Sequence, residues 1–299
     1  MSLDFSGRVA IVTGAGQGLG RTHALALAKR GAKVVVNDLG AATDGTGGDG
    51  SPAQQVVAEI EAMGGEAIAN GTNVCDEPQV AAMVAETMEK WGRIDILVNN
   101  AGILRDKTFS KMSLDDFRTV VDVHLMGSVT CTKAVWEIMR EQAYGRIVMT
   151  TSSSGLYGNF GQSNYGAAKL ALVGLMNTLH LEGAKFNIKV NSLAPVAATR
   201  MTEGLMPEEA FAALKPELVS EGLVTLVHED APSRMILCAG AGGFARSNIF
   251  ETKGISLGEA EATAENLVTR MGEINDESGH EAFTQGAQQS MKFLSALMK

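Results

Sequence analysis

Short runs of apolar, often β-branched residues alternate with longer helix-like stretches along the first 240 residues of the chain. The strand-like runs are RVAIVTG (8–14), KVVVNDL (33–39), EAIANGTNV (66–74), DILVNNAG (95–102), GRIVMTTS (145–152), IKVNSLAP (188–195) and SRMILCAG (233–240). The helix-like stretches between them are 20–31, 52–63, 77–91, 113–140 and 163–185. Strands that are apolar almost throughout are buried on both faces and lie parallel, with helical crossovers covering the sheet. Right-handed crossovers from the first strand predict a doubly wound α/β fold with a mostly parallel, seven-stranded sheet and helices on both faces.

The chain after residue 245 does not continue this pattern. Its segments TKGISLGEAEATAENLVTRMGEI and HEAFTQGAQQSMKFLSALMK read as polar amphipathic helices without a strand. We therefore expect residues 1–245 to form one domain, and residues 246–299 a helical C-terminal extension packed on that domain or on a neighbouring subunit. The glycine-rich segment GAATDGTGGDGSP (40–52) has the composition of a mobile surface loop, not of a domain boundary.

Composition restricts the classes of function. The net charge of −9 argues against a nucleic-acid partner, which needs a basic surface, although backbone amides can still bind phosphates locally. Cys75, Cys131 and Cys238 are far apart and form no CxxC pair, so we expect neither disulfides nor a metal site. No uninterrupted apolar run is long enough to span a membrane. The start, MSLDFSGRVAIV, shows no signal-peptide pattern and the end, SALMK, is no SKL-type peroxisomal address, so we expect a cytoplasmic protein.

The segment TGAGQGLG (13–20) lies where the first strand turns into the first helix. Gly14 allows a tight turn, Gly18 lets a pyrophosphate approach the backbone, and Gly20 permits close helix–strand packing. The amides at the start of the helix favour negative charge. The spacing is not the GxGxxG of most dinucleotide-binding turns, and such a turn can also exist for steric reasons alone. Its place in the first βα unit favours a nucleotide site.

Asp38 ends the second strand, about 20 residues after these glycines. A carboxylate there accepts hydrogen bonds from the adenosine ribose hydroxyls and repels a 2′-phosphate, which predicts NAD rather than NADP as the cofactor. Two alternatives stay open. In the first, Asp38 has no role in binding and is an ordinary turn residue in NDLG. In the second, Arg21 binds the 2′-phosphate of NADP instead of being a solvated helix residue.

Three features stand in a specific order: TGAGQGLG, then NNAG (99–102), then Ser152 thirteen residues before the YxxxK pair Tyr165 and Lys169. In this combination the first 240 or so residues resemble the short-chain dehydrogenase/reductase family. The resemblance implies a Rossmann fold, a nicotinamide cofactor and oxidoreductase activity on a secondary CH–OH group. It implies that Ser152, Tyr165 and Lys169 are catalytic. It also implies that the cofactor is bound by Gly14, Gln17, Gly18, Leu19, Gly20, Asp38, Asn73, Val74, Asn100, Ala101, Gly102, Tyr165, Lys169, Pro195 and Thr199.

Within that family the chain is similar to the (3R)-hydroxyacyl-CoA dehydrogenase part of peroxisomal multifunctional enzymes of type 2. The segments that carry this similarity are VNDLG (36–40), NNAGILRD (99–106), VHLMGS (123–128), YGNFGQSNYGAAKL (157–170), TRMTE (199–203), LMPE (205–208) and ALKPE (213–217). The similarity implies NAD-dependent oxidation of a (3R)-3-hydroxyacyl-CoA, an acyl thioester, to the 3-ketoacyl-CoA. The alternatives are a 3-ketoacyl thioester reductase acting on carrier protein, a steroid or secondary-alcohol dehydrogenase, and a nucleotide-sensing regulatory subunit without turnover.

Tyr165 and Lys169 are four residues apart on an expected helix, so both project from one face. Their ordinary pKa values, about 10 and about 10.4, make neither a base at neutral pH. We expect the Lys169 ammonium, with the positive nicotinamide ring, to lower the Tyr165 pKa, so that Tyr165 exchanges the proton of the substrate alcohol. Ser152 would hold the substrate oxygen in line with Tyr165, and Lys169 would also hold the nicotinamide ribose.

Other residues near these motifs leave alternatives open. Ser153 and Ser154 are expected to shape the turn, and Tyr157 either forms a wall of the substrate site or packs. His124 stands where most family members carry an asparagine whose helix kink holds a water in a proton relay; it either serves that relay or is a packed helix histidine. The segment NSLAPVAATR (191–200) lacks the family's usual glycine after the proline, so altered loop geometry is expected where it borders the nicotinamide amide.

The expected helix at 163–185 is apolar or small on almost every face, whereas a surface helix has a polar side. We therefore expect it to be buried between subunits of a homodimer or homotetramer.

Overall fold

The computed structural model describes residues 3–48, 51–198 and 207–297. The chain divides into two compact units, Met1–Arg246 and Ser247–Lys299. The first unit contains the alternating strands and helices, and the second contains three short helices.

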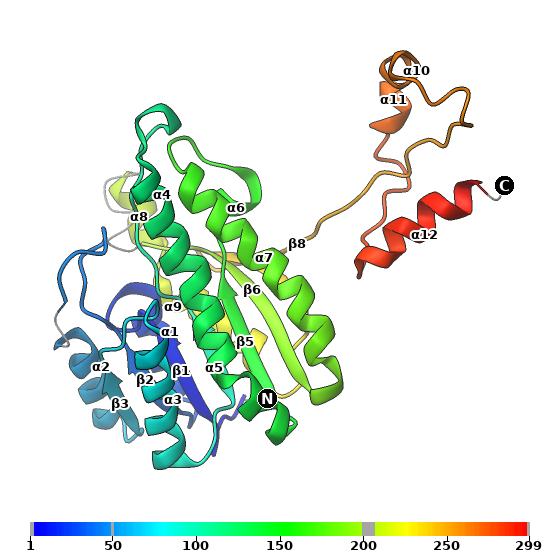
Figure 1. The fold of residues 1–299 in the computed structure, drawn as a ribbon. Helices are drawn as coiled ribbons and strands as arrows, with labels where there is room; N and C mark the ends of the chain where they lie inside the picture. The colour runs from blue at the N-terminus through cyan, green and yellow to red at the C-terminus, as the bar shows by residue number, and fades with distance from the viewer. Residues whose placement is uncertain (1–2, 49–50, 199–206, 298–299) are drawn as a thin grey trace. The chain divides into compact units, whose positions relative to one another are not determined.

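The first unit is built on an eight-stranded sheet in the order β3-β2-β1-β4-β5-β6-β7-β8 (Figure 1). The strands are β1 (Val9–Thr13), β2 (Lys33–Asn37), β3 (Ala67–Asn70), β4 (Ile96–Asn99), β5 (Gly145–Thr150), β6 (Ile188–Val196), β7 (Ile236–Gly240) and β8 (Gly243–Ser247). Strands β1 to β7 pair in parallel. The expected doubly wound, mostly parallel fold is confirmed. The expected number of seven strands was one too low, because β8 returns along the edge after a two-residue connection and its residues are mostly exposed, without an apolar run.

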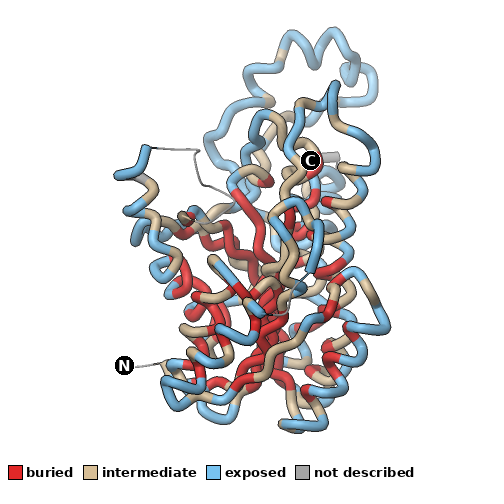
Figure 2. Tube along the Cα trace, turned by 90° about the vertical axis from the view of Figure 1, so that its left-hand side faces the viewer, coloured by how far each residue is buried: buried red, intermediate tan, exposed pale blue. Residues whose placement is uncertain are grey.

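Helices cover both faces of the sheet, and each face has its own apolar core (Figures 1 and 2). One core joins the sheet to α1 (Gly18–Ala28), α2 (Ser51–Ala62) and α9 (Pro216–Val227). The other core joins it to α3 (Glu77–Trp91), α5 (Gly127–Gln142) and α7 (Ser163–Gly183). The remaining elements of this unit are the 3₁₀ turns η1 (Phe109–Lys111) and η3 (Ala184–Phe186), with α4 (Leu114–Val121), η2 (Asp122–Met126), α6 (Ser153–Tyr157) and α8 (Glu208–Ala213).

The single helix expected over 113–140 is interrupted. Helices α4 and α5 are joined by η2, a π-helical turn that contains His124. The Ser128 hydroxyl donates to the His124 carbonyl oxygen at 2.6 Å, which satisfies an acceptor inside this turn. Single π-turns within α-helices occur frequently at functional sites.

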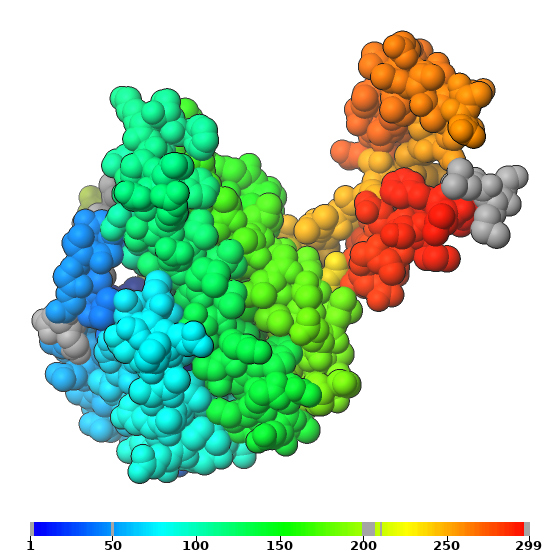
Figure 3. All heavy atoms as spheres, viewed as in Figure 1, coloured from blue at the N-terminus to red at the C-terminus, as the bar shows by residue number. Residues whose placement is uncertain are grey.

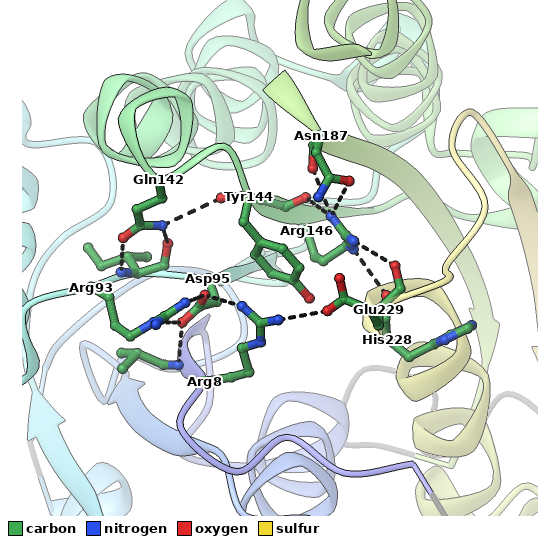
Figure 4. Close-up of polar contacts among 12 residues, drawn as sticks. Arg8, Arg93, Asp95, Gln142, Tyr144, Arg146, Asn187, His228 and Glu229 are labelled. Atoms are coloured by element: carbon green, nitrogen blue, oxygen red, sulfur yellow. Dashed lines mark hydrogen bonds and ion pairs between the residues drawn. The ribbon is translucent and has the colours of Figure 1, made fainter. Parts of the chain in front are cut away.

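A charged network joins the amino-terminal ends of the parallel strands (Figure 4). The Asp95 carboxylate is fully buried and accepts hydrogen bonds from the Arg8 and Arg93 guanidinium groups and from the Val9 backbone amide. The Arg146 guanidinium is also fully buried. Arg146 donates to the backbone carbonyl oxygens of Gly145, Asn187, His228 and Glu229. The network therefore ties the starts of β1, β4, β5 and β6 to the chain that follows α9.

The second unit holds α10 (Ala264–Thr269), α11 (Met271–Ile274) and α12 (Gly286–Leu297). Glu251 pairs through its backbone with Glu281 and through its carboxylate with the Lys292 ammonium at 2.8 Å. The Thr252 hydroxyl donates to the Ile274 carbonyl oxygen at 2.7 Å. Among the described residues of both units, no helix is long and apolar enough to cross a membrane.

Candidate active site

The first βα turn is held against the end of β4 by the NNAG segment. The Asn100 side-chain amide donates to the carbonyl oxygens of Thr13 and Gly14, and the Thr13 hydroxyl accepts from the backbone amides of Asn100 and Ala101. Gly14 has φ +63°, and a Cβ there would lie 2.8 Å from the Cα of Ala101. A Cβ on Gly20 would lie 2.0 Å from the Gly14 oxygen. Both positions therefore require glycine, and the turn lies at the point where the strand order reverses, where ligands bind in doubly wound sheets.

Asp38 lies beside this turn, at the carboxyl end of β2. Its Oδ2 accepts from the Gly16 amide at 2.7 Å and its Oδ1 from the Gly40 amide at 2.7 Å. Two backbone donors thus fix the carboxylate in orientation. Arg21 forms a two-pronged ion pair with Glu59, through Nε at 3.0 Å and through Nη2. Arg21 therefore has an acidic partner within the chain, in a pair whose two side chains are both partly exposed.

Ser152, Tyr165 and Lys169 meet where β5 ends and α7 begins. Ser152 is the N-cap of α6, and its Oγ accepts from the Ser154 amide at 3.2 Å while the same side chain hydrogen-bonds the Tyr165 phenol. The Lys169 Nζ donates to the Thr150 carbonyl oxygen at 2.5 Å and lies 5.5 Å from the centre of the Tyr165 ring. The three side chains that the sequence singled out are therefore brought together.

Burial changes the acid–base properties of this pair. Loss of hydration disfavours the phenolate and raises the pKa of Tyr165 to about 12, even though the hydrogen bond from Ser152 lowers it. The same loss of hydration disfavours the ammonium and lowers the pKa of Lys169 to about 7. The expected lowering of the Tyr165 pKa depends on the nicotinamide ring as well as on Lys169 and stays a prediction, while burial of the phenol acts in the opposite direction.

His124 reaches the same site from the π-turn. Its Nε2 lies 3.1 Å from the Ile103 amide nitrogen and 2.8 Å from the Ile103 carbonyl oxygen, and its ring contacts the Tyr165 ring edge-on at 5.1 Å. Burial and the Lys169 charge hold the pKa of His124 well below its ordinary value, so the imidazole is neutral. Its buried Nδ1 has no hydrogen-bond partner among the described residues. A Cβ on Gly102 would lie 2.3 Å from the His124 ring, so the glycine of NNAG makes room for it.

A cavity of about 500 Å³ runs through these groups. Most of the residues expected to bind a cofactor line it, namely Gly14, Gln17, Gly18, Leu19, Asp38, Asn73, Val74, Asn100, Ala101, Gly102, Tyr165, Lys169 and Pro195. Gly20 and Ser152 are not part of this lining. Thr199 lies outside the described residues, as do TRMTE and the first two residues of LMPE. Tyr157 does not line it; the residue is 73% exposed and its side chain hydrogen-bonds Cys238.

The sequence did not indicate the other residues that line the cavity. They include the segment after β2 (Leu39, Ala41, Ala42, Thr43 and Gly45), with Ile103, Thr119, Asp122, Val123 and Thr150. His124, which the sequence had indicated as a relay candidate, also lines the cavity. The glycine-rich segment 40–52 was expected to be a mobile surface loop, and its first residues line the cavity. Its hydrogen bonds to residues 104 and 105 use its backbone carbonyl oxygens, which leave no pattern in the sequence, and only its glycine content marked it.

The family model described as short chain dehydrogenase matches residues 8–210. The chain belongs to the short-chain dehydrogenase/reductase family. It is an oxidoreductase of that family, as its motifs implied.

The relatives include proteins of similar length and longer proteins that match over only part of their chain. A protein of Mycobacterium tuberculosis named as a short-chain type dehydrogenase/reductase is 48% identical over 273 residues, which cover 91% of this chain and 95% of that protein. Peroxisomal multifunctional enzyme type 2 of Drosophila melanogaster is 52% identical over 244 residues, covering 81% of this chain. The matched part is only 40% of that enzyme's length. A 3-oxoacyl-[acyl-carrier-protein] reductase of Synechocystis is 46% identical over 67% of this chain and 78% of its own.

The chain also superposes on solved structures of dehydrogenases. The full-length Drosophila multifunctional enzyme superposes with a TM-score of 0.83 at 39% identity, over 99% of this chain and 50% of that one. A 7α-hydroxysteroid dehydrogenase complexed with NADH and 7-oxo glycochenodeoxycholic acid superposes with a TM-score of 0.72 at 28% identity, over 82% of this chain and 96% of that one.

Proposed function

We propose that this short-chain dehydrogenase oxidises a (3R)-3-hydroxyacyl-CoA to the 3-ketoacyl-CoA with NAD. The observation that carries the proposal is one continuous cavity, with Asp38 and the glycine turn in its lining and with Tyr165 and Lys169 beside Ser152. The thioester substrate is supported by the similarity to the Drosophila multifunctional enzyme across 81% of this chain.

The residues present fit a nicotinamide dinucleotide. The turn requires glycine at positions 14 and 20, where a Cβ would meet the backbone, and the helix α1 begins there with free amides that favour a pyrophosphate. Two residues that line the same cavity, His124 and Thr150, each have a buried polar side-chain atom, Nδ1 and Oγ1, without a partner among the described residues. The nicotinamide would supply the hydride acceptor, and the ordered Asp38 carboxylate would hold the adenosine ribose.

Asp38 and Arg21 together support NAD over NADP. A 2′-phosphate would lie against a carboxylate that two backbone amides already hold in place. The nearby Arg21, which could have offset that repulsion, is paired with Glu59. A ribose with free hydroxyls makes favourable hydrogen bonds with the same carboxylate.

The chain's own residues account for the proton. Tyr165 takes the proton of the substrate hydroxyl as base, while Ser152, which already hydrogen-bonds the phenol, holds the substrate oxygen next to it. With a pKa of about 7, Lys169 carries its charge for part of the time at neutral pH, and a charged ammonium 5.5 Å from the ring favours the phenolate. A protonated Lys169 would therefore make Tyr165 easier to ionise.

The carrier-protein reductase is the second candidate function, favoured by the identity to the Synechocystis reductase. Such a reductase would more naturally use NADPH, which the Asp38 carboxylate disfavours. A steroid dehydrogenase is a further alternative, because the chain superposes on the 7α-hydroxysteroid dehydrogenase with a TM-score of 0.72. A regulatory subunit that only senses the nucleotide would not need Ser152, Tyr165 and Lys169 in contact.

We further propose a homo-oligomer, because α7 exposes Leu170 and Leu181 on the face turned away from the core, each 46% exposed. We place the reaction in the cytoplasm, since the chain has three free cysteines and no membrane-spanning helix among its described residues.

One assay tests the function. NADH formation is measured with (3R)- and (3S)-3-hydroxyacyl-CoAs, a 7α-hydroxysteroid and 2-propanol, each with NAD and again with NADP, with Tyr165→Phe as the inactive control. We expect turnover of the (3R)-thioesters with NAD and at least tenfold lower kcat/KM with NADP, about the effect of one unfavourable charge contact. Turnover of the steroid alone, or a preference for NADP, contradicts the proposal.

A further inference from the structure

The segment after β2, residues 40–48, crosses the cavity and ends against a different part of the molecule. We call it the strap. The Leu104 amide donates to the Thr43 carbonyl oxygen at 2.9 Å, and the Arg105 Nε donates to the Asp44 carbonyl oxygen at 3.1 Å. A Cβ on Gly45 would lie 3.3 Å from the Ile103 side chain, so the strap also packs on Ile103. In the space-filling view this blue segment lies across a hollow from the teal residues around α4 (Figure 3).

The strap has its own folded shape. Gly40, Gly45 and Gly47 all have positive φ, and the Asp44 carboxylate accepts from both the amide and the hydroxyl of Thr46. The Ala42 amide donates to the Thr46 carbonyl oxygen at 2.8 Å. Because these bonds are internal, the strap can detach from residues 104–105 without losing its conformation.

The strap is attached to the framework that holds the catalytic residues. The Arg105 carbonyl oxygen accepts from the buried Asn164 side-chain amide at 3.1 Å, and Asn164 directly precedes Tyr165. The Ile103 backbone is held by His124 at 2.8 and 3.1 Å. Residues 103–105 are therefore held in place by Asn164 and His124 of the active site. The same three residues bind the strap.

Of the two hydrogen bonds that hold the strap, the one from the Arg105 side chain can be removed by a substitution, whereas the one from the Leu104 amide belongs to the backbone. Its guanidinium connects the Asp44 carbonyl oxygen to the Asp116 carboxylate, 3.2 Å away, on α4. Lys107 pairs with the same carboxylate at 2.9 Å, and Asp116 therefore keeps a cationic partner if Arg105 changes. Arginine can reach both acceptors because its donors are arranged in a planar fork, which lysine lacks.

We infer that Arg105 is a positioning residue whose side chain latches the strap across the cofactor cavity and sets how fast the dinucleotide leaves. The inference rests on the proposed use of NAD. The strap lines the cavity together with Asp38, and Asp38 itself accepts from the amide of Gly40 where the strap begins. Opening the latch releases one wall of the adenosine half of the site and leaves Ser152, Tyr165 and Lys169 in place.

The test is NADH dissociation from the full-length chain, followed by stopped-flow fluorescence. In Arg105→Lys, which keeps the charge facing Asp116, and in Arg105→Gln, we expect release about tenfold faster, the effect of one charge-assisted hydrogen bond. The KM for NAD rises by the same factor, while kcat and the pH profile of turnover stay close to those of the unchanged protein. Lys107→Gln is the matched control, since it removes the other cation from Asp116 without touching the strap, and its release rate stays within about twofold.

Unchanged release in both Arg105 variants, or equal acceleration in Lys107→Gln, overturns the latch. A second measurement needs no substitution: hydrogen exchange of the Leu104 amide in the unchanged protein, which we expect to be slow and slower still with NADH bound. Exchange of that amide at the rate of an unprotected one in the NADH complex also overturns it. If the unchanged protein binds no NADH, both the proposed function and the latch are contradicted. If it binds NADH and the Arg105 variants release NADH at the same rate, only the latch is contradicted.

Discussion

Lys169 is the residue at which function and stability conflict most directly. Its side chain is 3% exposed, and its Nζ has one hydrogen-bond acceptor, the Thr150 carbonyl oxygen, among the interactions described. Burial lowers its pKa from 10.5 to about 7. In the unfolded chain the group stays protonated up to about pH 10, so between these values the unfolded state binds more protons than the folded one. Folding is therefore penalised by Lys169 at neutral pH, and the penalty falls as the pH rises.

Replacing this lysine should make the protein more stable and inactive. For Lys169→Met we expect a free energy of unfolding higher by on the order of 3 kcal/mol at pH 6.5, after about 1 kcal/mol is subtracted for the lost hydrogen bond. The gain should largely disappear at pH 9.5, where the folded lysine is neutral in the unchanged protein. Urea unfolding at both pH values checks this, with the exposed Lys133→Met as control. A gain that is equal at both pH values would refute the desolvated lysine as its cause.

The residues of the site differ in how far their roles can be predicted from the sequence. Ser152, Tyr165 and Lys169 are found by spacing, because one helical turn and one strand end fix their relation. Their pKa values are not found in this way, since these depend on how much water the folded protein removes. The strap is invisible for a different reason: Thr43 and Asp44 act through carbonyl oxygens, which every residue possesses.

At the scale of elements, the two ends of the parallel strands have different tasks. The carboxyl ends carry the turn, Asp38 and the catalytic residues, while the amino ends carry the buried network around Asp95 and Arg146 (Figure 4). The strands themselves could be predicted because parallel strands buried on both faces are apolar throughout. The π-turn at 122–126 could not, since it differs from an α-helix by one hydrogen-bond register and not by composition.

This separation predicts that stability can be lowered without changing the site. Asp95→Asn keeps the shape of the side chain but leaves the Arg8 and Arg93 charges without their buried carboxylate. We expect a loss of about 2 kcal/mol in the free energy of unfolding, below the usual cost of breaking a buried pair because both arginines are partly exposed. The affinity for NADH, measured by fluorescence titration, should not change.

Asp115→Asn provides the control for this comparison. It removes an ion pair with Arg118 in which both side chains are largely exposed, and it should cost less than about 0.5 kcal/mol. Weakened NADH binding in Asp95→Asn, at a temperature where the variant is fully folded, would show that the two ends of the sheet are coupled.

At the scale of the whole molecule, both apolar cores lie within the first unit. Their buried members run from Phe5 to Ala239, and none of the described residues of the second unit is among them. The second unit is held by its own bonds, such as the pair between Glu251 and Lys292, and exposes Met291, Phe293 and Leu294 along α12. A sequence pattern of amphipathic helices predicts such helices but does not specify the surface that their apolar faces cover.

Truncation after Arg246 should therefore leave a folded domain. Because no buried core residue is lost, we expect cooperative thermal unfolding by circular dichroism and NADH binding within about threefold of the full chain.

Light scattering of the full-length and truncated chains then distinguishes two possible locations of the contact between subunits. If α7 carries it, the truncated chain keeps the mass of the oligomer; if the second unit carries it, the truncated chain is a monomer. A monomeric full-length chain would contradict the homo-oligomer altogether, and an aggregated or unfolded truncated chain would show that the first unit depends on the second.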